Sequence, residues 1–201
     1  MSELDVLISR LREAVEALPG GLRDHVLRVE VEAEKLARLH DVDPGRARLA
    51  ALGHDLVRHK PPAELLTLAR EYDVATDAVE RATPILVHGP IAARILERDY
   101  ALTDADILAG IDCHTTARPG MAPLEKALFI ADKVEPEKLE HNPAWREVHS
   151  LAFDAATAPG KGLDLALRRF LDLHIESAVE RGWLIHQRSI DARNELLLMG
   201  A

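Results

Sequence analysis

The sequence predicts an all-α protein, and two observations carry this prediction. Ala, Leu, Glu and Arg are abundant in the 201 residues, whereas aromatic residues, which favour strands, make up only 3%. Apolar residues recur at helical spacing between breaks that contain Pro or Gly, and alternation with a period of two is not sustained anywhere.

The expected helices of the N-terminal half begin or end at these breaks. Residues 3–18 and 22–40 each carry an apolar stripe at helical spacing. Residues 44–56 begin with Pro44, whose missing N–H is harmless in a first turn. The next expected helices are residues 62–72, 76–82 and 89–98.

The C-terminal half continues in the same way. Asp104 is suited to cap a helix over residues 105–114, because its carboxylate can accept a free N–H group of the first turn. Pro123 lies in the first turn of the next helix, over residues 122–134. The remaining expected helices are residues 143–157, 163–181 and 189–198.

Charge and composition exclude several classes of function. The formal net charge is −9, so the chain lacks the basic surface that grips long nucleic acid. No apolar run reaches the ~18 residues of a membrane span, and the N-terminal segment lacks the apolar core of a signal peptide. The single cysteine forms no internal disulfide. A cytoplasmic protein with neither long nucleic acid nor a membrane as partner is expected.

Ionisable residues on apolar helix faces predict a metal site. A lone histidine on such a face is more often a hydrogen-bonded core residue than a ligand. Burying several such groups without partners is costly, however, and a divalent metal takes neutral imidazole and carboxylate as ligands. The residues that share this placement are His25, His54, Asp55, His88, His114 and Asp132. The other six histidines are expected to be ordinary structural or surface residues.

Four sequence strings narrow the interpretation further. They are LVHGPIAA (86–93), HTTARPGM (114–121), FIADKVEP (129–136) and LIHQRSIDARN (184–194). With these strings and the spacing of His25, the His54-Asp55 pair and Asp132, the chain resembles the HD-domain metal-dependent phosphohydrolases. The resemblance extends over residues 20–195 and is strongest to the YqeK-like symmetrical bis(5'-nucleosyl)-tetraphosphatases, which split diadenosine tetraphosphate into two ADP.

This resemblance implies a fold and a metal centre. The fold is an all-helical HD-domain bundle over residues 21–201, with residues 1–20 as a helix packed on it. One metal is held by His25, His54, Asp55 and Asp132, and a second by His88 and His114 with Asp55 bridging. Family members are associated with iron, and the site type also accepts manganese or another divalent ion.

The resemblance also implies a mechanism and a set of substrate contacts. A metal-bound water is the expected nucleophile, with Asp55 and His54 as the catalytic ligands. Arg118 is the first choice for a phosphate contact, because a guanidinium binds phosphate through two hydrogen bonds. The alternative role of Arg118 is a surface salt bridge. Further candidates for substrate contacts are Thr115, Arg58 and Lys133.

Two alternatives remain open for the function. The chain could act on another small nucleotide as an HD-type phosphatase or phosphodiesterase, or bind a nucleotide without catalysis. A homodimer is compatible with the sequence. Leu22, Val26, Arg58 and Ala117 stand where the resembled family carries other residues, and none of them is an expected metal ligand.

Overall fold

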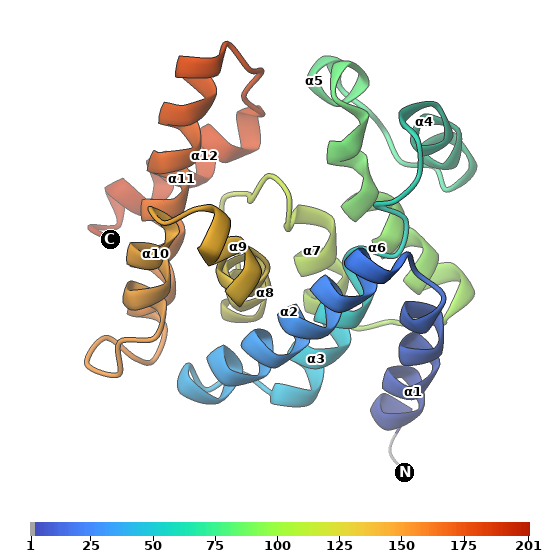
Figure 1. Cartoon of the computed structure of the whole chain (residues 1–201), viewed down its shortest axis with the longest axis horizontal. Coiled ribbons are helices and arrows are strands. Elements are labelled where there is room, and N and C mark those ends of the chain that lie inside the picture. The colour runs from blue at the N-terminus through green and yellow to red at the C-terminus, as the bar shows by residue number, and fades with distance from the viewer. Residues whose placement is uncertain (1–2) are drawn as a thin grey trace.

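The computed structural model describes residues 3–201, which fold into α-helices and one 3-10 helix, with no β-strand in this part of the chain (Figure 1). The predicted all-α fold is therefore confirmed. Met1 and Ser2, at the start of the predicted N-terminal segment, lie outside the described residues. The elements are α1 (Glu3–Glu16), α2 (Gly20–Leu39), α3 (Pro44–Gly53), α4 (Pro62–Glu71), α5 (Ala78–Ala82), η1 (Pro84–Val87), α6 (His88–Asp99), α7 (Ala105–Cys113), α8 (Pro123–Val134), α9 (Pro136–His141), α10 (Trp145–Ala152), α11 (Lys161–Arg181) and α12 (Gln187–Leu198).

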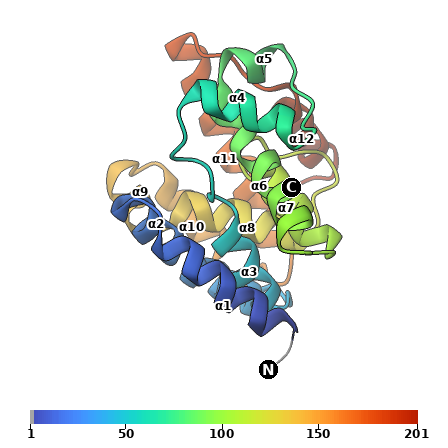
Figure 2. The same cartoon turned by 90° about the vertical axis from the view of Figure 1, so that its right-hand side faces the viewer.

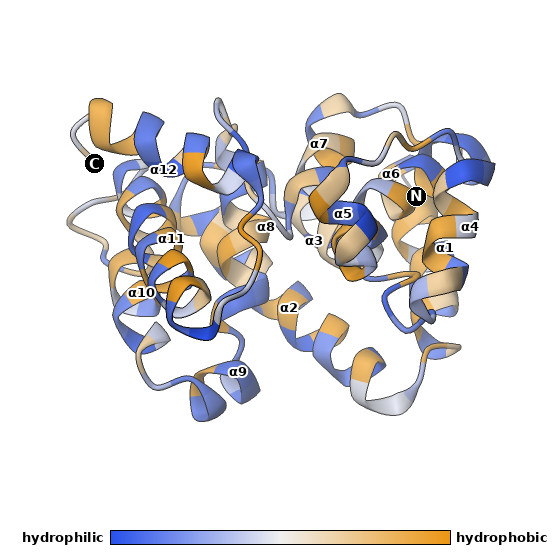
Figure 3. Ribbon diagram, turned by 90° about the horizontal axis from the view of Figure 1, so that it is seen from above, coloured by the Kyte–Doolittle hydropathy of each residue, from blue (hydrophilic) through white to orange (hydrophobic). Residues whose placement is uncertain are grey.

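Two short elements, η1 and α9, are not predicted by the sequence pattern. Pro136 reads as a break between helices, but it is the first residue of α9. Glu135 caps this helix by accepting the N–H of Glu137 at 3.0 Å. Because proline needs no N–H bond in a first turn, it can start one helix directly after another has ended. Helix α9 is mainly hydrophilic (Figure 3), and none of its residues is buried, although Leu139 packs against the main core.

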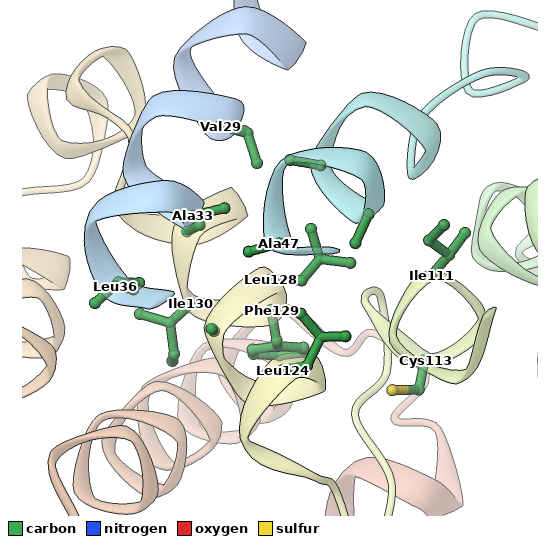
Figure 4. Close-up of a cluster of buried hydrophobic side chains, with 14 of the residues drawn as sticks. Val29, Ala33, Leu36, Ala47, Ile111, Cys113, Leu124, Leu128, Phe129 and Ile130 are labelled. Atoms are coloured by element: carbon green, nitrogen blue, oxygen red, sulfur yellow. The ribbon is translucent and has the colours of Figure 1, made fainter. Parts of the chain in front are cut away.

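Helix α8 lies at the centre of the main hydrophobic core. Its residues Leu128, Phe129 and Ile130 are fully buried, among side chains from α2, α3 and α7 (Figure 4). Helices α10 and α11 pack against it as well. Each fully buried side chain of this size contributes roughly 1.5–3 kcal/mol relative to exposure. The core therefore fixes α8, and with it Asp132 in the last turn of this helix.

The two ends of the molecule differ in how they join this core. Helix α1 packs its buried residues Ile8, Leu11 and Val15 into the main core. Figures 1 and 2 both place α4 and α5 at the opposite end from α1. There a smaller cluster, which includes Leu65 and Val87, packs beneath α4 and η1.

Within residues 3–201, no helix combines the length and apolar composition that crossing a membrane requires.

Asp104 connects α3 and α7, the helices that end next to His54 and His114. Its carboxylate caps α7 by accepting the N–H groups of Asp106 and Ile107. The same carboxylate accepts two hydrogen bonds from Arg46 on α3, at 2.6 and 2.7 Å. Burial acts to raise the pKa of Asp104, but Arg46 and the helix N–H groups outweigh it and lower this pKa below 3.8.

Replacing this carboxylate should destabilise the fold in a pH-dependent way. Asp104→Ala is expected to lower the free energy of unfolding by about 2 kcal/mol at neutral pH, because it removes a helix cap and an ion pair. Since the folded-state pKa is depressed, the stabilisation is present above the unfolded-state pKa and is lost as the pH falls through the folded-state value. Denaturant unfolding at about pH 7 and about pH 2.5 measures the difference. An equal difference at both pH values would contradict this account.

Candidate metal centre

The structure brings the six residues expected as metal ligands into one buried cluster. Helix α2 supplies one residue, the ends of α3 and α7 supply three, and α6 and α8 supply one each. None of the six is more than 5% exposed. They are His25, His54, Asp55, His88, His114 and Asp132.

The carboxylate of Asp55 lies between two pairs of imidazole rings. Its Oδ1 atom is 2.9 Å from Nε2 of His88 and 3.5 Å from Nε2 of His114. Its Oδ2 atom is 3.5 Å from Nε2 of His25 and 3.4 Å from Nε2 of His54. One carboxylate oxygen thus faces each pair, which gives two groups of ligand atoms that share Asp55.

Helix ends set the orientation of three of the rings. The Nδ1 atoms of His54 and His114 lie 2.6 and 2.8 Å from the carbonyl oxygens three residues earlier, and His88 makes the same type of bond to Ile85. The last carbonyls of a helix lack a continuing helical partner and can accept such bonds. The carbonyl of Ile85 accepts the backbone N–H of His88, and its second lone pair accepts the bond from the ring. Because a carbonyl only accepts hydrogen bonds, each Nδ1 carries the proton. Each Nε2 therefore presents a lone pair to the centre of the cluster.

These lone pairs lack adequate partners within the protein. The Nε2 atoms of His25 and His54 are buried and make no hydrogen bond. The Nε2 atoms of His88 and His114 face each other at 2.9 Å. Such a contact needs an extra proton or a cation between the rings. A divalent metal satisfies all four nitrogen atoms, so the residues fit a metal centre.

The protonation states of Asp55 and His114 agree with this fit. Burial acts to raise the pKa of Asp55, but contacts with His54, His114 and His88 outweigh it and lower this pKa well below its usual range. Burial, together with the neighbouring rings of His88 and His54, lowers the pKa of His114 to about 3. At neutral pH Asp55 is therefore ionised and His114 is neutral, which are the forms of these two residues that metal binding requires.

Glu135 and Arg28 support His25 from outside the cluster, and the sequence analysis does not identify either contact. Nδ1 of His25 lies 3.2 Å from Oε1 of Glu135, which is 1% exposed. Nε of Arg28 donates to the other oxygen of Glu135 at 2.6 Å. A carboxylate in this position fixes the tautomer of a ligand histidine and raises its basicity.

Three cationic side chains border the cluster. Arg58 donates to Oδ2 of Asp55 at 3.0 Å. Lys133 and Lys138 each bind one oxygen of Asp132, and Lys133 also donates to the carbonyl oxygen of His114 at 3.1 Å. Burial acts to raise the pKa of Asp132, but the two ammonium groups outweigh it and lower this pKa well below its usual range. Arg58 and Lys133 are predicted site residues, whereas Lys138 lies on the unpredicted helix α9.

A hollow of about 170 Å³ opens onto this cluster. Thr115, also a predicted site residue, lines it and donates from Oγ1 to the carbonyl oxygen of Leu86 at 3.3 Å. The cations described above line the same hollow, so positive charge surrounds the opening of the ligand cluster. The lining residues are Asp55, Arg58, Ile85, Leu86, His88, His114, Thr115, Asp132, Lys133 and Lys138.

Arg118 does not lie at this hollow. Its guanidinium makes two hydrogen bonds to Glu125, at 2.6 and 2.8 Å, and it lines a different hollow together with Arg94. Glu125 is 1% exposed and also accepts the N–H of Ala122 at the start of α8. The structure therefore places Arg118 as the counter-ion of a buried carboxylate, outside the hollow that opens onto the cluster.

His186 provides a contrast with the histidines of the cluster. It is 7% exposed, and its Nε2 lies 3.3 Å from Asp77 and 3.6 Å from Glu80. Its Nδ1 accepts the backbone N–H of Arg188, so Nε2 carries the proton of the neutral ring. This tautomer is opposite to that of the cluster histidines, and it suits a structural contact between α5 and the start of α12.

Removing the Arg118 side chain tests its structural role. Arg118→Ala is expected to lower the free energy of unfolding by about 2 kcal/mol, because the buried carboxylate of Glu125 loses its counter-ion. Affinity for a phosphorylated substrate should not change. Arg94→Ala, in an exposed pair with Glu97 at the same hollow, is the matched control and should have little effect. Weaker substrate binding with unchanged stability would instead support a phosphate contact.

Comparisons with known proteins agree with the geometry. The sequence pattern of the HD domain family matches residues 22–137, which include all six cluster residues. A Staphylococcus aureus protein named symmetrical bis(5'-nucleosyl)-tetraphosphatase is 30% identical over 183 residues, which cover 91% of this chain and 90% of that protein. A Bacillus subtilis protein of the same name is 33% identical over 128 residues, which cover 64% of this chain and 67% of that one.

A solved structure extends the comparison to the whole fold. It is a Clostridium acetobutylicum protein described as a "predicted HD superfamily hydrolase involved in NAD metabolism". The two folds superpose with a TM-score of 0.84 at 27% identity, over 95% of this chain and 97% of that one. The chain belongs to the HD-domain family of metal-dependent phosphohydrolases and, within it, to the family of the symmetrical bis(5'-nucleosyl)-tetraphosphatases.

Proposed function

We propose that this protein hydrolyses dinucleoside tetraphosphates and cleaves diadenosine tetraphosphate symmetrically into two ADP. The observation that carries this proposal is the placement of Asp55 between two pairs of buried imidazoles that direct Nε2 lone pairs toward it. The activity named for the Staphylococcus aureus relative supports the choice of substrate.

Two divalent ions are proposed to occupy the cluster. His25, His54 and Asp132 would hold one ion, His88 and His114 the other, and Asp55 would bridge them. Iron and manganese both suit a set of imidazole and carboxylate ligands. When bound, such ions lower the pKa of a coordinated water toward ~7 and neutralise charge on phosphoryl oxygens.

The cationic side chains bind and orient the phosphate chain. In the reaction, a water oxygen joins the β-phosphorus of one half, and the bond from that phosphorus to the central bridging oxygen breaks. The bridging oxygen leaves on the other half. Negative charge grows on this oxygen, and the donors of Arg58, Lys133 and Lys138 stabilise it by electrostatic attraction. Thr115 adds a hydroxyl at the edge of the same hollow.

Loss of a cluster ligand should remove metal and activity together. Asp55→Asn and His88→Gln are each expected to reduce turnover at least about 100-fold and to abolish the rise in melting temperature that Mn²⁺ causes in the wild type. Elemental analysis after dialysis gives an independent readout. Asp112→Asn, which removes an exposed carboxylate paired with Arg188, is the matched control. Retention of metal and turnover in both ligand variants would contradict the assignment.

The reaction products distinguish symmetrical from asymmetrical cleavage. With Fe²⁺ or Mn²⁺ supplied, the wild type is expected to convert diadenosine tetraphosphate into ADP alone, because the attacked bond is the central one. Anion-exchange chromatography of the products at early time points measures this. Formation of AMP and ATP would overturn symmetrical cleavage, and no turnover of any dinucleoside polyphosphate would overturn the proposed function.

A further inference from the structure

The hollow above the metal-ligand cluster is small for the proposed substrate. Its volume is about 170 Å³, whereas small-molecule sites usually measure ≈ 300–1,000 Å³. A dinucleoside tetraphosphate bound with its central bond at the cluster must therefore extend beyond this hollow. Symmetrical cleavage also requires space on both sides of the cluster, because two phosphates and one nucleoside lie on each side of the bond that breaks.

A second hollow, of about 320 Å³, reaches the cluster from the side of His25. The first hollow borders the cluster at His88 and His114 instead. Arg58 and Lys138 line both hollows. The two hollows therefore adjoin at a pair of cations, and the metal-ligand cluster contributes residues to the walls of both.

The charges of the second hollow suit a phosphate-bearing ligand at this shared edge. Arg58 directs one of its five N–H donors to Asp55, and its side chain is 38% exposed. Lys138 is 23% exposed and contacts Asp132. Glu135 and Glu137 place two negative charges among the lining residues, and both carboxylates are paired with Arg28.

We propose that the second hollow binds the leaving nucleoside diphosphate half of the substrate. The phosphate chain crosses from one hollow to the other over the cluster, and Arg58 and Lys138 contact phosphates at the shared edge. The distal nucleoside lies toward His141 and Asn142, which line the second hollow beyond these cations. This inference rests on the proposed function. Binding of the second half in this hollow would make the protein prefer dinucleotides to mononucleotides as substrates.

Filling the hollow tests this assignment. Asn142→Trp is expected to raise KM for diadenosine tetraphosphate about tenfold by displacing the distal nucleoside. The inhibition constant of adenosine tetraphosphate, which has four phosphates but no distal nucleoside, should change less than about twofold. Asn194→Trp, at an exposed asparagine of the hollow between α11 and α12, is the matched control and should change neither constant. Equal changes in both constants, or no change, would overturn the proposal.

A charge variant gives a second test that does not depend on tolerance of a large side chain. Glu137→Gln removes a negative charge from the second hollow and should lower KM for diadenosine tetraphosphate about threefold at low ionic strength, with a smaller effect in high salt. Glu97→Gln, a carboxylate of similar exposure paired with Arg94, should have no effect. An unchanged or higher KM for Glu137→Gln would overturn the proposal. Failure of the wild type to cleave the substrate would instead overturn the proposed function.

Discussion

The hydrogen bonds between histidine Nδ1 atoms and backbone carbonyls determine what the buried cluster can bind. His54, His88 and His114 each follow their acceptor by three residues, at a helix end or a 3-10 turn. The acceptor fixes both the tautomer and the direction of each ring, so the backbone determines where the Nε2 lone pairs converge. Only His25 uses a side-chain acceptor, because it lies within α2, where the backbone carbonyls are already bonded. Glu135 therefore lies at Nδ1 of His25 in the position that a backbone carbonyl occupies at the other three rings.

The charge of the chain is distributed unevenly around this cluster. The net charge of −9 disfavours polyanions at long range, yet Arg58, Lys133 and Lys138 gather at the hollow over Asp55 and Asp132. These cations bind the carboxylates of Asp55 and Asp132 and line the hollow that opens onto the cluster. The protein thus places a local group of cations at the cluster, which suits a small polyanion better than a long nucleic acid.

The sequence predicts much of this structure, and the contacts that it does not reveal have physical causes. The helical period and the Pro and Gly breaks predict the all-α fold. The six residues that the structure brings into one buried cluster are predicted because one motif ties together positions far apart in the chain. Lys138 is not identified because Pro136 reads as a break, although Glu135 caps a short helix there. Arg118 is assigned to phosphate from its place in a motif. Sequence spacing does not reveal Glu125, whose buried carboxylate binds this guanidinium through two hydrogen bonds.

Glu125 also determines the chemistry of the single cysteine. Cys113 directly precedes the cluster residue His114, is fully buried, and donates from Sγ to Glu125 at 3.5 Å. Burial, together with the negative charge of Glu125, raises the pKa of the Cys113 thiol far above its usual range. The sulfur is therefore held as a buried, uncharged thiol, the form that is least reactive toward oxidants. The cluster thus offers imidazole nitrogen and carboxylate oxygen as donors, a set that accepts several divalent ions.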